Sequence, residues 1–544
     1  MKVERYRWET SQPITRDYIQ RFEAVAGLYA YNPWDDSSEQ RRAEWLDRAS
    51  RPQADRDRLA AALRAYNENV GNTGLALDHI EALRDSRTLV VTGGQQAGLF
   101  TGPLLVLYKA ITVITEARQA ANQLGRTVVP LFWIAGEDHD FEEANHTYVL
   151  TDSLALQKIK INASSDVKTS VSRSEITGES WEEAVAQLEQ TLLNSEFKPE
   201  LVARIRDICI SSNTLTEQFA KTLAWLFGEY GLILLDSDDP NIRALESAMF
   251  EQIATKQDEL GASVMAGKSR LEALGYAAQV ELSANQSHLF VFHEGERLLL
   301  QRNDDGTFSD RRRKVTLTVG QLTELAVQSP DKLSNNVVSR PLMQDYLLPV
   351  LTVVLGPSEI AYWGLLRGAF EQFGLQMPIL VPRYEFTLLE GTVQKQMTKF
   401  ALSFEDIICR LDEKQTSWLE AQGSLQVEQL FADAKAKFND LYGPVVEAVS
   451  GINPGLRKLG ETNKQKIVEQ IDFLEARAAE AFRSQHESAL RHWERIRMSV
   501  LPSGKPQERL YNVFQYWAKY GGGWLRELME APLARDGDHR IIYF

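Results

Sequence analysis

The chain has 544 residues, which is too long for one hydrophobic core and predicts two to four domains. Its apolar content of 44% and charged content of 25% are those of an ordinary globular protein. The net charge of −15 disfavours a nucleic-acid partner, because binding a polyanion requires a basic surface and local patches such as Arg311–Lys314 do not dominate the acidic background.

The termini and the cysteines exclude further classes. The stretch Met1–Pro13 is charged throughout and has no apolar centre like that of a signal peptide. No apolar run approaches the length of a membrane span, so we expect no membrane partner. Cys209 and Cys409 are the only cysteines and lie far apart, which supports neither a disulfide framework nor a zinc ribbon. These features predict a cytoplasmic protein.

Residues 1–87 are mostly helical by pattern, and Ser38–Arg64 is predicted to be one amphipathic surface helix. The next stretch, 87–147, reads strand, glycine-rich turn, helix, strand and acidic loop. Thr88–Thr92 is β-branched, as in a strand covered on both faces. The turn that follows contains glycines that permit positive φ angles and close backbone approach, namely Gly93, Gly94, Gly98 and Gly102.

This turn leads into a helix for which Pro103 suits the first turn, and the N-terminus of that helix would favour an anion. Thr127–Ile134 is a second buried strand, and the acidic run Glu137–Asp140 follows its carboxyl end, where open α/β sheets place their ligands. The sequence therefore predicts a ligand crevice here. An ordinary tight turn and a solvated loop are the alternatives, and neither GxGxxG nor the phosphate-loop pattern is present.

Two segments are predicted to be insertions in a sheet. The first, about 150–228, has a helical pattern interrupted at Asn162–Asp166. Leu232–Leu235 then reads as a core strand, and its acidic end offers Asp236 and Asp238 either to a metal or ribose or to the start of the next helix. The second insertion, about 270–320, predicts a small antiparallel β-meander, a lid or specificity domain, from the alternating runs Ala278–Leu282, Leu289–Phe292 and Leu298–Gln301.

The core is predicted to return with the strand Val350–Leu355 and to end with Met377–Val381. Ser358 and Glu359 fall in the first turn of the helix after the first of these strands, on the same edge as the earlier loops. Arg340 lies in a polar loop before the strand Val350–Leu355. It is predicted either to bind a carboxylate or phosphate in a bidentate manner or to form a surface ion pair.

After Arg383 the pattern is that of long helices. Apolar residues recur at spacings of three and four, Gly451–Gly455 reverses the chain, and a return helix runs to about Met498. We expect a core over 1–383, an antiparallel coiled coil over 384–500, and a segment over 501–544 that returns to the core. In that last segment a loop offers a phosphate site through Ser503, Lys505 and Arg509, or is a plain connection.

Three runs carry a family resemblance: TGGQQAGLFTGPLLVLYK, WIAGEDHDFEE and LGPSEIAYW. They resemble the BshC family, the cysteine-adding enzymes of bacillithiol biosynthesis, and the resemblance extends over nearly the whole chain. It implies an α/β fold: a Rossmann-like parallel-sheet core related to class I nucleotidyl-transferring enzymes, with inserted connecting segments and a C-terminal helical coiled coil that forms a homodimer. The implied reaction joins cysteine to the amine of glucosaminyl-malate.

Joining a free carboxylate to an amine requires activation, so we expect ATP or another nucleotide with Mg²⁺, and no tightly bound metal or organic cofactor. A class I-like core implies an acyl-adenylate. Catalysis then needs positioning, charge neutralisation and a base rather than an enzyme nucleophile. The candidate residues are the backbone of the glycine turn with Gln95, Gln96 and Thr101 as donors, Asp138, His139 and Asp140 to orient the amine or Mg²⁺ with His139 in proton transfer, and Asn145 in support.

Two other functions are compatible with parts of the sequence. The run EDHDFEEANH holds five carboxylates and two histidines, enough for a metal-dependent hydrolase, although catalytic metals usually gather ligands from several elements. A dimeric coiled-coil scaffold without catalysis is the second alternative, but it does not account for a glycine turn and an acidic loop together.

Overall fold

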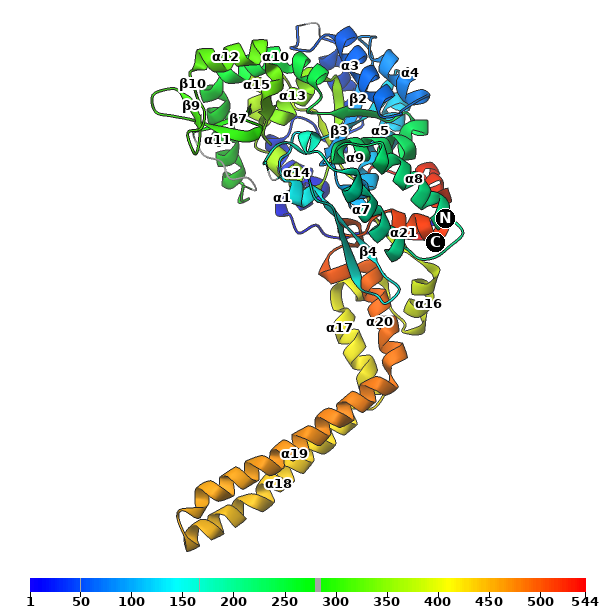
Figure 1. Ribbon diagram of the computed structural model, residues 1–544, viewed down its shortest axis with the longest axis vertical. Helices are drawn as coiled ribbons and strands as arrows, with labels where there is room; N and C mark the ends of the chain where they lie inside the picture. Colours follow the sequence, from blue (N-terminus) through cyan, green and yellow to red (C-terminus); the bar gives the residue numbers. More distant parts are fainter. Residues whose placement is uncertain (49, 166, 279–284) are drawn as a thin grey trace. The chain divides into compact units, whose positions relative to one another are not determined.

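The computed structural model describes residues 1–48, 50–165, 167–278 and 285–544 (Figure 1). The chain forms two compact units. The first comprises Met1–Thr387 and Glu508–Ile542, and the second comprises Leu388–Gln507 with Tyr543–Phe544.

The first unit is built on a five-stranded parallel sheet with the order β13-β12-β2-β3-β6. These strands are almost entirely buried, which is why their sequences are continuous apolar runs rather than alternating ones. Strands β3 and β6 follow on one side of β2, and β12 and β13 lie on its other side. The topological switch point, where the strand order reverses, therefore lies between β2 and β12. The strands are β2 (Leu89–Gln95), β3 (Val128–Ile134), β6 (Ile233–Asp236), β12 (Val350–Leu355) and β13 (Ile379–Pro382). The Rossmann-like core predicted from the sequence is confirmed.

The N-terminal region is helical, but the predicted single helix over Ser38–Arg64 is wrong. It is divided into α2 and α3, between which the chain turns. Arg42 of α2 is completely buried: it pairs with Asp345 and donates to the carbonyls of Val350 (2.9 Å) and Gln376 (2.8 Å), which fixes α2 against the sheet. The elements are β1 (Lys2–Tyr6), α1 (Pro13–Gln20), α2 (Ser37–Leu46), α3 (Arg56–Asn69) and α4 (Leu75–Ala82), followed after β2 by α5 (Leu105–Leu124).

The first insertion, between β3 and β6, contains a hairpin where its predicted helical pattern begins. Strands β4 (His146–Leu150) and β5 (Leu156–Lys160) pair antiparallel, and along β4 half-buried and buried residues alternate. The helical prediction failed there because this short run has the period of two that defines a half-buried strand. The short helix α6 (Phe141–Ala144) precedes the hairpin. Three helices follow it, namely α7 (Gly178–Thr191), α8 (Lys198–Ile210) and α9 (Leu215–Phe227).

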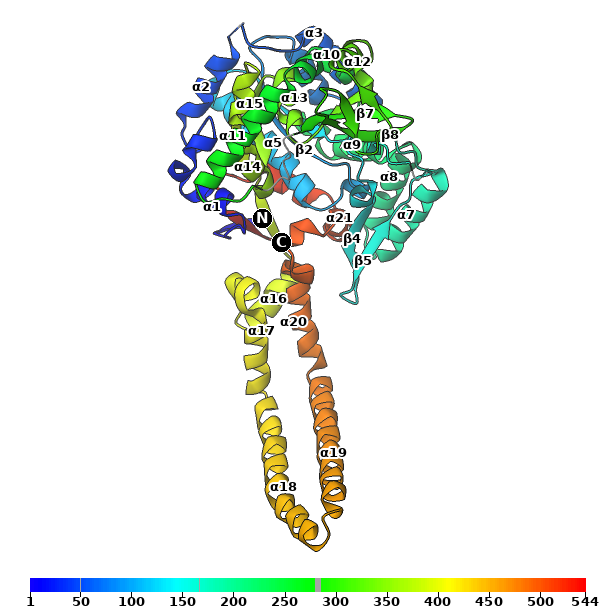
Figure 2. The same ribbon diagram turned by 90° about the vertical axis from the view of Figure 1, so that its left-hand side faces the viewer.

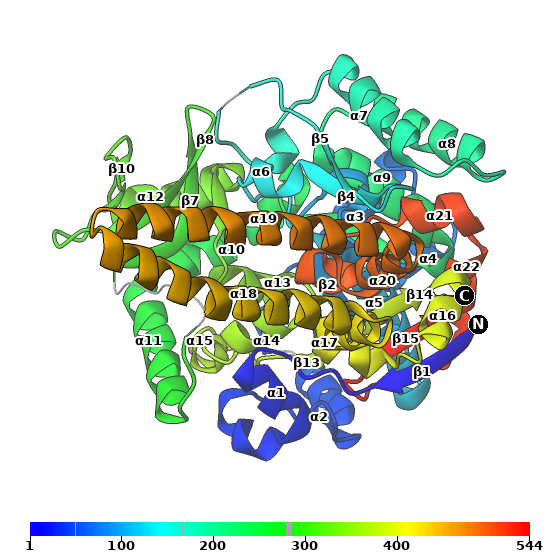
Figure 3. The ribbon, with the colours of Figure 1, turned by 90° about the horizontal axis from the view of Figure 1, so that it is seen from below.

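The second insertion contains the predicted antiparallel meander, as a sheet with the order β10-β9-β8-β7-β11. The predicted run Ala278–Leu282 falls largely on 279–284, outside the described residues. The inner face of this sheet shares one hydrophobic core with the parallel sheet. Figure 3 shows it well apart from α7 and α8. Its elements are α10 (Pro240–Thr255), α11 (Gln257–Ala273), β7 (Gln286–His293), β8 (Glu296–Arg302), β9 (Phe308–Asp310), β10 (Thr316–Leu317), α12 (Val319–Gln328) and β11 (Leu333–Asn335).

The remaining elements complete the first unit. The C-terminal segment adds α21, α22 and β15, and β15 lies between β1 and β14 in a three-stranded sheet. The bounds are α13 (Ser339–Leu347), α14 (Pro357–Trp363), α15 (Arg367–Gln372), β14 (Glu385–Leu389), α21 (Phe514–Tyr520), α22 (Gly523–Glu530) and β15 (His539–Tyr543).

The second unit is a helical hairpin in which α18 (Ser424–Ile452) and α19 (Leu456–Gln485) run antiparallel (Figure 2). The predicted reversal at Gly451–Gly455 is confirmed. Before it the helix is broken: α16 (Gly391–Lys399) ends, Ala401 has a φ of 53°, and the Ser403 side chain caps α17 (Phe404–Ala421). The return path ends with α20 (Glu487–Val500). No helix in the described part of the chain has both the length and the apolar character that crossing a membrane requires.

Candidate active site

A buried lysine occupies the switch point. Lys109, on α5, is 1% exposed and donates to the carbonyl of Gly94 (2.7 Å), to Gln95 Oε1 (3.0 Å) and to Glu359 Oε2 (2.6 Å). Glu359 Oε2 also accepts the backbone N–H of Gly356 (2.7 Å), so Lys109 links the end of β2 to the first turn of α14. Burial lowers the pKa of Lys109, while Glu359 opposes that shift. The sequence interpretation assigned Glu359 and Gln95 to this edge but missed Lys109.

Arg340 lies beside this pair, on α13. It is half-buried and donates to Gln344 Oε1 (3.1 Å) and to the hydroxyl of Tyr362 (3.3 Å). Within the described ranges no carboxylate forms an ion pair with it, so the surface ion pair considered from the sequence is not observed. Burial lowers the pKa of Arg340, but Tyr362 and Glu359 raise it by more, and the guanidinium stays charged. We call Gln95, Lys109, Arg340, Glu359 and Tyr362 the switch-point cluster.

The glycine turn differs from the prediction. β2 extends through Gln95, so Gly93 and Gly94 belong to the strand, where a Cβ on Gly94 would lie 2.6 Å from the carbonyl oxygen of Trp133. A Cβ on Gly98 would lie 2.9 Å from the Cα of Gly102. Only Gly102 among the four uses a positive φ, of 69°. The other three glycines therefore serve close packing.

The predicted anion cradle at the start of α5 is largely used by the protein itself. The backbone N–H groups of this turn donate within the protein: Phe100 to Gln218 Oε1 (3.1 Å), Gly102 to the Leu99 carbonyl (2.8 Å) and Leu104 to the Tyr511 carbonyl (2.9 Å). Asn512 also donates to the carbonyls of Phe100 (2.8 Å) and Gly102 (3.0 Å). Thr101 is completely buried in this turn with a φ of 76°, so it does not face the crevice as a donor.

The acidic loop after β3 contributes three side chains with different partners. Gln96 Nε2 donates to Asp138 Oδ2 and to Glu143 Oε2 (3.1 Å), which joins the ends of β2 and β3 as expected for one crevice. Asp140 instead caps α6 by accepting the N–H of Glu143 (3.2 Å). His139 Nδ1 accepts from Arg297 Nη1 (3.0 Å), an arginine of β8 that sequence reasoning missed.

The bond from Arg297 decides the protonation of His139. A guanidinium only donates, so Nδ1 must be unprotonated and Nε2 carries the proton. Burial and the charge of Arg297 both lower the pKa of His139, although Asp138, whose Oδ1 lies 3.8 Å from Nδ1, opposes the shift. His139 is therefore a neutral donor near pH 7, rather than the ready proton acceptor that the sequence interpretation assumed.

Other predicted residues lie away from these contacts. Asn145 is buried at the end of α6, where it donates to Glu142 Oε1 (3.3 Å). Ser358 is exposed in the first turn of α14, and Arg509 is exposed in the first unit. Ser503 and Lys505 are exposed residues of the second unit.

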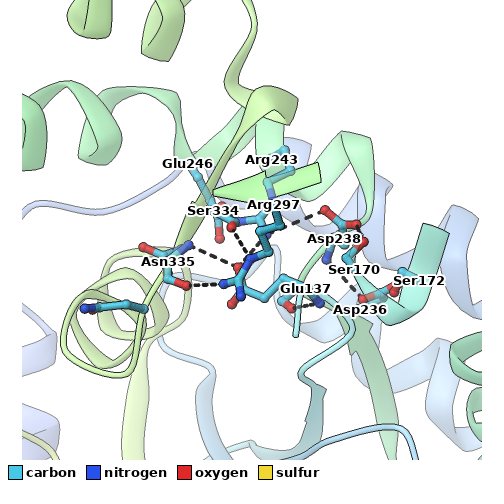
Figure 4. Close-up of polar contacts among 12 residues, drawn as sticks. Glu137, Ser170, Ser172, Asp236, Asp238, Arg243, Glu246, Arg297, Ser334 and Asn335 are labelled. Carbon is cyan, nitrogen blue, oxygen red and sulfur yellow. Dashed lines mark hydrogen bonds and ion pairs between the residues drawn. The ribbon is translucent and has the colours of Figure 1, made fainter. Parts of the chain in front are cut away.

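A buried ion network lies at the carboxyl ends of β3 and β6 (Figure 4). Arg243 pairs with Glu137 (2.5 Å) and Glu246 (2.6 Å) and lies 3.7 Å from Asp238. Asp238 also accepts from Nε and Nη2 of Arg173, at 2.8 Å each. Asp239, rather than Asp236 or Asp238, caps α10. The capping role predicted for Asp236 and Asp238 is therefore wrong, while the metal or ribose role stays a prediction.

Asp236 makes stability depend on pH. It is buried and accepts from Ser172 Oγ (2.7 Å), and burial, followed by the charge of Asp238, raises its pKa to about 7. Between its unfolded value near 4 and pH 7 the unfolded chain loses a proton that the folded chain keeps, so stability falls as pH rises. We expect Asp236→Asn to remove this loss, so that its free energy of unfolding relative to that of wild type rises by about 2 kcal/mol from pH 5 to pH 7. Urea unfolding followed by tryptophan fluorescence measures the difference, and a difference that does not change with pH would contradict the assignment.

A parallel sheet with this strand order, and with polar side chains gathered at its switch point, defines a Rossmann-like α/β domain, a class whose ligands bind at that edge of the sheet. In the part of the chain that the structure describes, no three His, Cys, Asp or Glu side chains are arranged to hold a metal ion.

Comparisons with known proteins agree with this class. The N-terminal Rossmann-like domain of bacillithiol biosynthesis BshC matches residues 1–384, and the C-terminal coiled-coil domain of BshC matches residues 386–544. The chain is 35% identical to a protein of Geobacillus thermodenitrificans over 100% of both chains, and 34% identical to one of Bacillus cytotoxicus over 98% of both. A protein of Symbiobacterium thermophilum is 35% identical over 97% of this chain and 96% of its own. All three are named "Putative cysteine ligase BshC".

The chain belongs to the BshC family, which places it among the ligases of bacillithiol biosynthesis.

Proposed function

We propose that this protein is a cytoplasmic ligase that adds cysteine to the amine of glucosaminyl-malate, with ATP or another nucleotide activating the cysteine carboxylate. The observation that carries the proposal is the match of both domains, end to end, to a family whose relatives are named cysteine ligases. The crevice supports it, because cationic and hydrogen-bonding groups from β2, α5, β8 and α14 meet at one sheet edge.

The residues of the proposed site have different roles in this reaction. Gln95, Lys109, Glu359 and Tyr362 of the switch-point cluster place the nucleotide and cysteine, because Lys109 fixes the carboxyl end of β2 and the start of α14 together. The amine attacks the activated carbonyl carbon, the nucleotide's phosphate oxygen leaves, and the ammonium proton passes to Asp138, whose side chain is 31% exposed. His139 donates through Nε2 to a substrate oxygen.

A homodimer formed through the coiled coil is part of the proposal. The hairpin of α18 and α19 exposes large apolar side chains that a partner would cover: Leu430, Leu441, Val445, Ile452, Leu459, Phe473 and Leu474. Light scattering of the purified protein should give the mass of two chains, and the mass of one would contradict this assembly.

The reaction is tested directly with purified protein, ATP, Mg²⁺, cysteine and glucosaminyl-malate, analysed by mass spectrometry with each component omitted in turn. We expect cysteinylated product only in the complete mixture. AMP as co-product indicates an adenylate, whereas ADP indicates an acyl-phosphate. Absence of product from the complete mixture with folded protein would overturn the ligase proposal.

A further inference from the structure

Two guanidinium groups beside the crevice have no carboxylate partner. Several other buried arginines of the first unit are paired: Arg42 with Asp345, Arg243 with Glu137, and Arg383 with Glu508 (2.6 Å). In contrast, the described residues offer no ion pair to Arg297 or Arg340. Arg51 is also buried without an ion pair to any described residue, and it donates to the Asp345 carbonyl and to Gln53 Oε1. Carboxylates such as Glu137 and Glu359 favour the charged forms of Arg297 and Arg340 without forming ion pairs with them. The remaining N–H donors of these two arginines are therefore suited to an anionic ligand.

Arg297 is held rigidly but keeps unused donors. It is 8% exposed and donates to Ser334 Oγ (2.8 Å) and the Asn335 carbonyl (2.7 Å) (Figure 4). It also donates to His139, and its Cζ lies 3.7 Å from the centre of the Phe290 ring. Three of its five N–H groups are thus engaged. His139, with 39% of its side chain exposed, has Nε2–H left as a donor because Nδ1 accepts from Arg297.

Arg340 follows the same short segment of chain. Its backbone N–H donates to the carbonyl of Asn336 (3.0 Å), next to the Asn335 carbonyl that Arg297 binds. Only two of its five side-chain donors are used, both on neutral oxygens of Gln344 and Tyr362. Asn335, whose carbonyl Arg297 binds, is 2% exposed, and neither Nδ2 nor Oδ1 of its side chain has a hydrogen-bond partner in the described structure. Buried amides without partners are rare and are consistent with a group that a ligand completes.

Charge balance indicates the class of anion. Two unpaired guanidiniums match two single negative charges, and each planar fork fits one carboxylate. A pyrophosphate group would bring more charge than this pair neutralises. Resting on the proposed function, we propose that Arg340 and the Arg297–His139 pair bind the two carboxylates of the malyl group, and so select a dicarboxylate acceptor.

The test uses the full-length protein and calorimetric titration with L-malate, L-lactate and pyrophosphate. L-Lactate keeps one carboxylate and the hydroxyl of malate but lacks the second carboxylate. We expect wild type to bind malate at least tenfold more tightly than lactate, and Arg340→Gln to lose that preference. Arg297→Gln should do the same, while Arg340→Lys retains part of it. Arg311→Gln, an exposed arginine on the same insertion, makes the same charge change and should bind like wild type.

Each outcome has a defined meaning once melting curves show the variants to be folded. Equal malate binding by wild type and Arg340→Gln overturns the inference, as does no malate binding by wild type. Pyrophosphate binding that depends on both arginines, with malate unaffected, assigns the site to nucleotide phosphates instead. If the ligase assay fails but malate selectivity depends on the arginines, the proposed function fails and the dicarboxylate site stands. If ligation proceeds and the KM for glucosaminyl-malate is unchanged in Arg340→Gln, only this inference fails.

Discussion

Lys109→Met should lower kcat/KM for cysteine ligation by about 100-fold or more. Lys109 is too buried to meet a substrate, so it acts by position: its ammonium holds the Gly94 carbonyl, Gln95 and Glu359 in one arrangement. Without it Glu359 keeps an unbalanced charge at the switch point, and displacements of about 1 Å at a reacting centre cost about two orders of magnitude in rate. Steady-state kinetics with glucosaminyl-malate as the varied substrate measures the effect.

The double variant Lys109→Met with Glu359→Gln separates charge from position. It removes both members of the pair, so we expect melting temperature to recover toward wild type while most of the rate loss remains. Lys332→Met, which removes an exposed lysine from the same unit, should leave kinetics unchanged. Full recovery of rate in the double variant would show that charge balance is all that Lys109 provides, and a single variant as active as wild type would contradict its role altogether.

The sequence predicted the parts of the fold that local pattern controls. Continuous apolar runs gave the strands of the parallel sheet, and the Gly451–Gly455 reversal gave the helical hairpin. It failed where local pattern was weak or interrupted. The hairpin β4–β5 is too short for its alternation to outweigh the helical segments around it, and the break before Ser403 depends on a single residue with positive φ, Ala401.

Sequence reasoning located the functional residues that follow the ends of strands, and it missed those whose role depends on contacts between distant segments. Gln96 meets Asp138 as the shared sheet edge required. Arg297, however, is 158 residues from His139, and no spacing in the sequence connects them. Lys109 left a signal that was not used, because it is the only charge in the apolar run 104–114 and a lone cation on a buried helix face needs a buried partner.

Arg243→Met should destabilise the first unit by about 3–5 kcal/mol at pH 8, the cost of removing one partner from a buried ion pair. Arg243 is completely buried and serves Glu137 and Glu246, with Asp238 at 3.7 Å. Methionine fills a similar volume, so the loss reports charge rather than a cavity. Urea unfolding measured by tryptophan fluorescence gives the free energy.

The pH dependence of that loss distinguishes an electrostatic cause from a packing cause. Burial already raises the pKa of Glu246 to about 8 even with Arg243 present, so this carboxyl takes up a proton readily. In Arg243→Met the buried carboxyls have still higher pKa values than in wild type, so the folded variant keeps protons that the unfolded chain loses. The stability of the variant therefore falls as pH rises. The loss of unfolding free energy in Arg243→Met should therefore become smaller as pH is lowered from 8 to 5. Adding Glu246→Leu should recover part of the loss, because a buried pair replaced by apolar residues leaves fewer unpaired charges. A penalty that is constant over this range would mean that Arg243 stabilises the unit by packing alone.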